Sequence, residues 1–173
     1  MTDLPLLSEP NLQQQLVEIG YQGKKLEELE GLGATEKAKM LFIVQDPYTS
    51  YYDAKVVRDF VALTQKLGFS PIILPFKPNG KAMHIKGFLA RFSKTAKTQA
   101  EFLNRVAKLN VPLVGVDSAI VLSYRDEYKE ALGDSRGDFH VLTAHEWLTN
   151  QLESNTLQSA VKNIAKSDRT FEW

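Results

Sequence analysis

Apolar and polar positions alternate in two different ways along the chain from residue 40 onward. Continuous apolar runs, typical of strands buried on both faces, lie at 40–45, 71–76, 113–116 and 139–143. Apolar residues at helical spacing predict helices at 53–67, 86–92, 98–109, 118–132 and 144–153, with a turn at 133–137. Strands that alternate with helices indicate right-handed crossovers. The pattern therefore predicts an α/β fold, a three-layer sandwich in which helices flank a mainly parallel sheet of about four strands.

The two ends of the chain do not follow this pattern. Residues 1–38 are polar, rich in proline and glycine, and hold only short helical patterns near 12–19 and 25–29. We interpret them as a linker or helical lead-in to an α/β lobe at 39–153. Residues 154–173 predict a C-terminal helical tail, with one more helix near 157–164, that leads out of a fragment of a larger protein.

Three predicted loops should meet at one edge of the sheet. They follow the first three strands, and ligands of parallel sheets bind outside the carboxyl ends of the strands. The polar, aromatic and glycine residues of these loops are therefore candidates for binding: Asp46, Tyr48, Thr49, Asn79, Gly80, Lys81, Asp117 and Ser118.

Each candidate also has a simpler interpretation. Asp46 and Asp117 could act together in acid–base chemistry or hold a hard cation, but a carboxylate after a strand more often caps the following helix. Tyr48 could stack on a ligand ring together with Tyr51 and Tyr52. We favour an interface for these three tyrosines, because aromatic side chains after a strand more often close a core or meet a partner.

Composition excludes several kinds of chemistry. The chain of 173 residues has no cysteine, which excludes disulfides, thiol catalysis and thiolate metal sites. The histidines, His84, His140 and His145, do not have the spacing of a zinc site on a helix. No nucleophile motif surrounds the serines and threonines. The sequence therefore assigns no catalytic residue and no metal ligand.

Charge is balanced overall but not locally. Lysine plus arginine and aspartate plus glutamate number 21 each, yet residues 77–97 carry six basic residues and no acidic one: Lys77, Lys81, Lys86, Arg91, Lys94 and Lys97. Such a patch is either a solvated face or a binding surface for an anion or an acidic partner. Nucleic acid is not expected, because no recognition motif accompanies the patch.

Hydropathy argues for a protein outside the membrane. No apolar run approaches the roughly 20 residues that a membrane-spanning helix needs. Residues 1–10 carry Asp3 and Glu9 and no basic residue, unlike a secretory signal. We expect a cytoplasmic protein that does not span the membrane.

Three motifs in order carry a resemblance to a known family. They are Asp46-Pro47-Tyr48-Thr49, Pro78-Asn79-Gly80 and Asp117-Ser118-Ala119-Ile120, with the segment 86–92 between the second and third. Over about residues 41–148 the chain resembles the C-terminal cysteine-rich CCG domain of bacterial FAD-linked, iron–sulfur D-2-hydroxyacid dehydrogenases. These include the D-lactate, glycolate and D-2-hydroxyglutarate type enzymes, and the domain is related to one in heterodisulfide reductase.

The resemblance also shows what this chain has lost. Cysteines that hold a cluster in the family are replaced at Pro47, Pro78, Asn79 and Ile120, so no cofactor is expected in this chain. The family module has two such lobes, and this chain holds one. FAD and a 4Fe-4S cluster would belong to the parent protein, whose flavin domain, ferredoxin-like domain and second CCG-like lobe would be the partners.

The resemblance implies an accessory, non-catalytic lobe of an FAD- and iron–sulfur-dependent oxidoreductase that oxidises a D-2-hydroxyacid. The parent would be cytoplasmic or peripheral to the inner membrane. Two alternatives remain open from the residues alone. One is an α/β domain that binds a small molecule or an anion at the rim, and the other is a docking module that uses the basic stretch 77–97.

Overall fold

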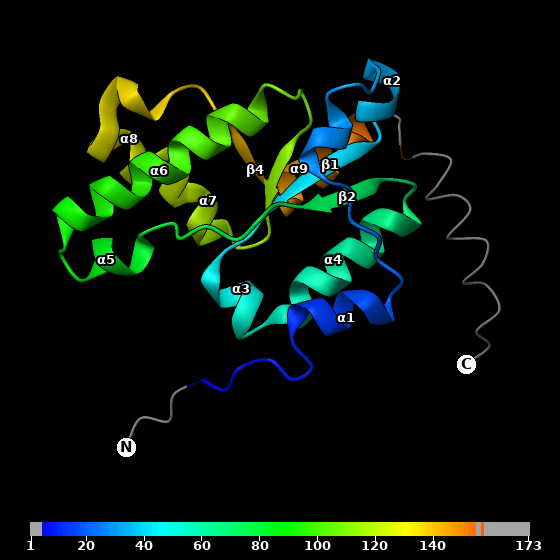
Figure 1. The fold of residues 1–173 in the computed structure, drawn as a ribbon, viewed down its shortest axis with the longest axis horizontal. Helices are drawn as coiled ribbons and strands as arrows, with labels where there is room; N and C mark the ends of the chain where they lie inside the picture. Colours follow the sequence, from blue (N-terminus) through cyan, green and yellow to red (C-terminus); the bar gives the residue numbers. More distant parts are fainter. Residues whose placement is uncertain (1–4, 155–156, 158–173) are drawn as a thin grey trace.

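The fold is built on a four-stranded parallel sheet. The computed structural model describes residues 5–154 and 157 (Figure 1). The strands stand in the order β2-β1-β3-β4, and every neighbouring pair is parallel. Their bounds are β1 Met40–Val44, β2 Ser70–Ile73, β3 Leu113–Gly115 and β4 Val141–Thr143. The predicted α/β class and parallel sheet are confirmed.

Helices cover both faces of this sheet. On one face lie α6 (Leu89–Ala107), α7 (Ser118–Arg125) and α8 (Glu127–Leu132), and on the other lie α1 (Leu12–Glu18), α4 (Ala54–Lys66) and α9 (Ala144–Glu153). Alternate residues of β1 serve the two cores. Phe42 packs in the first and Ile43 in the second, both at least 99% buried.

Several helix bounds differ from the sequence prediction. The two helices expected at 86–92 and 98–109 are one helix, α6, because its buried positions continue at helical spacing through Phe92, Ala96 and Leu103. The helix expected at 118–132 is divided at Asp126 into α7 and α8. Three short helices were not predicted, namely α2 (Ala34–Lys37), α3 (Pro47–Tyr51) and α5 (Lys81–Ile85).

The predicted turn at 133–137 is a 3₁₀ helix, η2 (Gly133–Arg136). The first 38 residues contribute α1, the 3₁₀ helix η1 (Leu26–Leu29) and α2 (Ala34–Lys37). Leu12 and Leu16 of α1 are buried in the same core as α4, so part of the predicted lead-in packs on the lobe. The predicted helix at 157–164 lies outside the described residues, apart from Leu157. Within the described part of the chain, no helix has the length and apolarity needed to cross a membrane.

Candidate functional site

The strand order creates a switch point between β1 and β3, where the chain turns from one side of the sheet to the other. Asp46 and Asp117 begin the two loops at this point, and each caps the helix that follows. Asp46 Oδ1 accepts a hydrogen bond from the Thr49 backbone N–H at 2.9 Å, and Asp117 Oδ1 accepts one from the Ala119 N–H at 2.8 Å. Both carboxylates therefore act as helix caps.

Asp46 and Thr49 are further tied to each other. The Thr49 hydroxyl donates a hydrogen bond to Asp46 Oδ2, and the two residues are only 2% and 6% exposed. Because the side chain is buried, this carboxylate is poorly accessible to an incoming ligand.

The loop after β2 is also held by internal contacts, although Asn79 Nδ2 is buried without a hydrogen-bond partner in the described part of the chain. Asn79 is 4% exposed, its Oδ1 accepts from the Lys81 N–H at 3.0 Å, and its backbone oxygen accepts from the Tyr128 hydroxyl at 2.6 Å. Gly80 has φ +80°, and a Cβ there would lie 2.9 Å from Phe92 Cδ2. Glycine is needed at this position both for its backbone conformation and for the close approach of the Phe92 ring.

An aromatic cluster fills the space beneath these loops. The Tyr124 and Tyr128 rings meet edge-on at 5.0 Å between centroids, and the Phe92 and Tyr128 rings do so at 5.7 Å. Gln99 Nε2 donates to the Tyr124 hydroxyl at 3.4 Å. Burial, and to a smaller extent the nearby charge of Asp46, raises the pKa of the Tyr124 hydroxyl. Both effects favour the neutral form of this hydroxyl.

Lys81, the basic residue of the rim, is already paired. Its Nζ contacts Glu127 Oε1, and His84 Nδ1 lies 3.8 Å from the same oxygen. Burial works against ionisation of Glu127, but the hydrogen bond from Lys81 and the Lys81 charge leave its pKa below the ordinary value. Lys81 therefore neutralises a carboxylate of α8 and is not a free anion site.

The four positions at which the resemblance places cluster cysteines do not fit an iron–sulfur cluster. Pro47 is the first residue of α3, Pro78 is exposed, Asn79 is buried, and Ile120 packs partly buried against the core. None carries a thiolate, and clusters are held by thiolates. His140 and His145 are exposed. Among the described residues, no group of three or more His, Cys, Asp or Glu side chains could hold a metal ion.

A hollow of about 770 Å³ lies beside the filled rim, at the carboxyl ends of β1 and β2. Its polar lining includes Tyr21, Gln45 and Ser50. The Tyr21 hydroxyl accepts from the Ile73 N–H at 2.9 Å, and the Ser50 hydroxyl donates to Gln45 Oε1 at 3.0 Å. Lys24 and Lys25 are exposed at its wall.

Sequence reasoning missed Tyr21, Gln45 and Ser50 of this hollow. Gln45 directly precedes the rim motif, so its position at the strand end was a usable signal. Tyr21 lies in the predicted linker, and no local pattern connects it to β2. Of the predicted candidates, Tyr48 and Ser118 are exposed, and Tyr48 stacks on Tyr52 with 6.3 Å between ring centroids.

Relatives of the chain carry a consistent name. A protein of Haemophilus influenzae named D-2-hydroxyglutarate dehydrogenase is 79% identical over all 173 residues, which make up 17% of that protein. Proteins with the same name from Escherichia coli and Pantoea ananatis are 64% and 56% identical, over 89% and 91% of this chain and 15% and 16% of their own lengths.

These similarities relate the chain to one part of a group of larger proteins. The chain spans 17% or less of the length of these curated relatives, so it corresponds to a part of larger proteins. They are consistent with a domain of a D-2-hydroxyacid dehydrogenase, and the name that the relatives share is D-2-hydroxyglutarate dehydrogenase. No family model matches the chain, and no solved structure matches it.

Proposed function

We propose that this chain is an accessory, non-catalytic lobe of a dehydrogenase that oxidises D-2-hydroxyglutarate. The observation that carries the proposal is the identity of 79% over the whole chain with a protein of that name. The occupied rim supports the non-catalytic part, because Asp46, Asn79 and Lys81 are engaged in contacts within the lobe.

FAD and a 4Fe-4S cluster, in this proposal, belong to other domains of the parent protein and supply its redox chemistry there. The lobe descends from a CCG-type domain whose cluster site has been replaced by packing. Its partners are the flavin domain, the ferredoxin-like domain and the second CCG-like lobe, and the parent enzyme works in the cytoplasm or at the inner membrane. Tyr124 and Tyr128, packed beneath the loops, support the loss of a cluster site.

A kinetic comparison in the full-length enzyme tests this assignment. Asp117→Asn and Lys81→Met should leave kcat and KM for D-2-hydroxyglutarate within roughly threefold of the wild type, since neither side chain meets reacting atoms in this proposal. A fall in kcat of about a hundredfold, with unchanged flavin and iron content, would mean that the rim takes part in the chemistry.

Reconstitution tests the loss of the cluster site. The 173-residue chain is incubated with iron and sulfide under anaerobic conditions, and the desalted protein is examined for visible absorbance and iron content. We expect neither, because the chain has no cysteine. Stoichiometric iron with a cluster absorbance band is the result that would overturn the proposal.

The hollow beside the rim favours a second candidate function. With a volume of about 770 Å³, apolar walls and Lys24 and Lys25 at one side, it suits a small anion that carries an apolar part. Thermal unfolding with D-2-hydroxyglutarate, nucleotides and inorganic phosphate tests this function. A rise in Tm that disappears in Ser50→Leu, which fills the hollow, would support it, and no rise with any of these compounds would remove it.

A further inference from the structure

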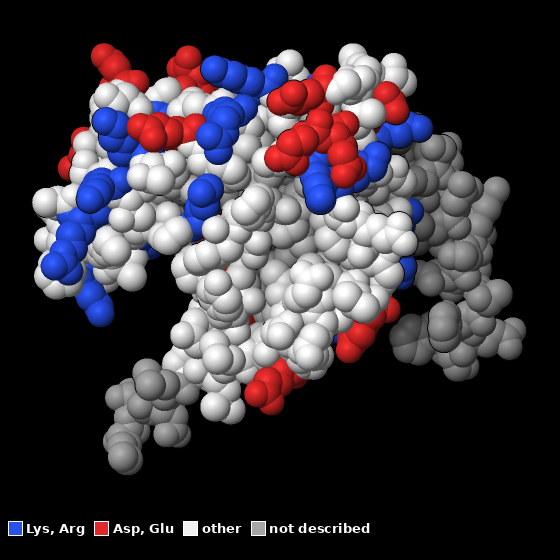
Figure 2. All heavy atoms as spheres, viewed as in Figure 1, with Lys and Arg blue, Asp and Glu red and all other residues white. Residues whose placement is uncertain are grey.

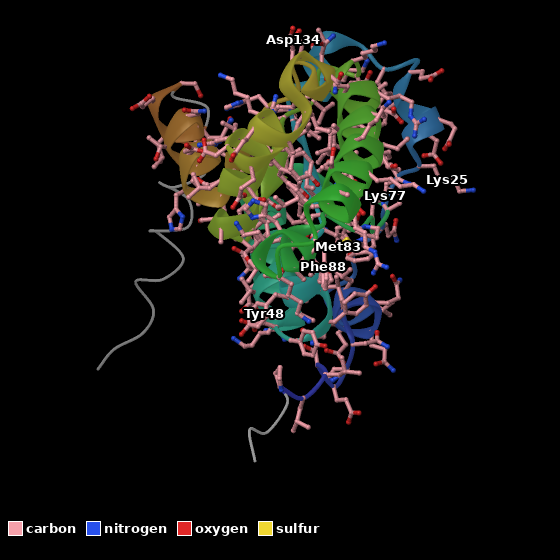
Figure 3. All side chains as sticks on the ribbon, turned by 90° about the vertical axis from the view of Figure 1, so that its left-hand side faces the viewer. Lys25, Tyr48, Lys77, Met83, Phe88 and Asp134 are labelled. Atoms are coloured by element: carbon pink, nitrogen blue, oxygen red, sulfur yellow. The ribbon has the colours of Figure 1, made fainter. Side chains whose placement is uncertain are left out.

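One face of the lobe displays large apolar side chains that the core does not use. We call it the rim surface: Tyr48 and Tyr51 of α3, Tyr52 directly after it, and Ile85, Phe88 and Leu89 around the junction of α5 and α6. Ile85 is 72% exposed, Leu89 59% and Phe88 52%. Tyr48 and Phe88 lie on the same side of the molecule (Figure 3). Single exposed apolar residues are normal, but an exposed tyrosine and an exposed phenylalanine on one side, each with exposed apolar neighbours in the chain, are typical of an interaction site.

The space between the two parts of this surface is hollowed. Figure 2 shows a notch in the outline between the tip formed by α5 and the start of α6 and the region of α3, and mainly uncharged side chains border it. Basic side chains gather at the tip in the same view. The shape and the distribution of charge suit a protruding partner whose centre is apolar.

The exposed apolar groups of α5 and α6 are held in place. The Phe88 N–H donates to the Met83 backbone oxygen at 2.9 Å, and Gly87, with φ +75°, allows the sharp turn between the two helices. Thr95 Oγ1 contacts Met83 Sδ at 3.7 Å, which ties α5 to α6. An ordered turn that points Ile85 and Phe88 to solvent is prepared for docking at small cost in conformational entropy.

The α3 part of the surface is fixed as well. The Tyr51 ring meets Phe76 edge-on at 5.2 Å, and the Tyr51 backbone oxygen accepts a hydrogen bond from the Ser8 N–H at 2.7 Å. Tyrosine and phenylalanine are enriched at the centres of protein interfaces because they bury much area with few rotatable bonds.

Exposed basic side chains predominate beside the rim surface, although Glu127 and Glu130 line a groove together with Leu89. Lys86, Arg91, Lys94 and Lys97 are exposed, and among the described residues none of them forms an ion pair with a carboxylate. Arg91 lies over the Phe88 ring at 5.8 Å from its centroid. A complementary partner therefore offers an apolar centre with aspartate or glutamate around it.

Resting on the proposed function, we propose that the rim surface docks on an apolar, acid-bordered surface of another domain of the same dehydrogenase polypeptide. At least 83% of the length of each relative named above lies outside the part matched here, since the match covers 17% or less. A partner within the same polypeptide is present at high effective concentration, which suits a docking surface of modest size.

Site-specific photo-cross-linking in the full-length enzyme tests the docking. A benzoylphenylalanine is placed at Phe88, and the matched control carries it at Val17, which is 66% exposed on α1. We expect position 88 to give a cross-linked species of monomer mass, joined to a peptide outside these 173 residues that contains acidic residues. The yield at position 17 should be roughly ten times lower.

Three outcomes overturn the proposal: equal yields at positions 88 and 17, a cross-link of dimer mass, which indicates a second copy, or attachment only within the 173 residues. A second measurement tests the contribution of the basic side chains to docking. Arg91→Glu together with Lys94→Glu should lower the cross-link yield at position 88 roughly tenfold, and unchanged yield would contradict the acidic border.

The kinetic test of the proposed function separates the two ideas. If the rim variants retain activity while position 88 fails to cross-link, the accessory role stands and the docking surface is wrong. If the rim variants lose activity while the cross-link forms as expected, the lobe takes part in chemistry and still docks through the rim surface.

Discussion

The carboxyl edge of the sheet has two halves. Both follow from the same pattern of parallel strands, but one half is filled by side chains and the other keeps a hollow. Over β1 and β3, Tyr124, Tyr128 and Phe92 fill the space beneath the loops, and Asp46 is only 2% exposed. Over β1 and β2, a hollow of about 770 Å³ remains beside Gln45. A position at the edge of a parallel sheet thus makes a site possible, but the side chains that pack there decide whether space for a ligand remains.

Removing an aromatic ring from the filled half should have the largest effect. Tyr124→Ala should lower the free energy of unfolding by about 3–5 kcal/mol, because it leaves a cavity among rings that hold the loops. Urea unfolding followed by circular dichroism measures this loss. Ile85→Ala, at a residue that is 72% exposed, is the control and should stay within about 0.5 kcal/mol of the wild type. Equal effects would mean that the filled half is not a packed core.

A methyl group added at Gly80 should cause the second-largest loss of stability. Gly80→Ala combines an unfavourable backbone conformation with a contact of 2.9 Å to Phe92, and we expect a loss of about 3 kcal/mol. Gly87→Ala is the matched control, since its φ is +75° and no atom lies within 4 Å of the added group. It should lose only about 1–2 kcal/mol. A loss at Gly87 as large as that at Gly80 would rule out the close packing against Phe92.

Two tyrosine hydroxyls, one in each half, compare the halves directly. Tyr128→Phe leaves the buried Asn79 oxygen without its donor and should cost about 1–3 kcal/mol. Tyr21→Phe frees the Ile73 N–H beside the hollow, where water can replace the hydroxyl, and should cost less than about 1 kcal/mol. Differences in urea midpoint measure both, and the reverse order would contradict the contrast between a filled and an open half.

The smallest expected effect is the pH dependence of stability that comes from the ion pair between Arg125 and Glu146, beside β4. The hydrogen bond from Arg125, with that from the Thr143 N–H, lowers the pKa of Glu146 to about 2. A lowered pKa in the folded state gives stability that is present above the ordinary pKa near 4.5 and is lost as pH falls from there through about 2. The Glu146 side chain is 43% exposed, so solvent screens much of the interaction.

Glu146→Gln should therefore be slightly less stable than the wild type at pH 7, and the difference should shrink as pH falls toward 2. Urea midpoints at several pH values measure it. Glu130→Gln, a substitution at an exposed glutamate of α8, is the control and should show no such trend. A difference at Glu146 that does not depend on pH would show that the ion pair is not its cause.

The sequence predicts the sheet better than it predicts the short elements around it. The four buried strands are recognisable because each is a continuous apolar run. α2, α3 and α5 were missed because helices of four or five residues contain too little periodicity to detect. The division at Asp126 was missed for another reason. Apolar periodicity continues across it, and the segment 118–132 contains no glycine or proline that would mark a break.

The candidate site likewise has features that the sequence predicted and features that it could not predict. The strand pattern predicted where the rim loops lie, and capping by Asp46 and Asp117 was the favoured interpretation of those residues. The occupation of the rim could not be predicted, since Tyr128 and Asn79, which share a hydrogen bond, are 49 positions apart. The wall that Tyr21 contributes to the hollow is equally remote, with 52 positions between it and Ile73.

The sequence by itself determined two properties of this protein. Buried apolar runs that alternate with helical segments require a parallel sheet covered on both faces, and a chain without cysteine cannot hold a thiolate-ligated cluster. The tertiary structure alone decided which half of the carboxyl edge is closed and which apolar side chains face solvent. Those outcomes depend on packing between residues far apart in the chain, and local patterns contain no record of such contacts.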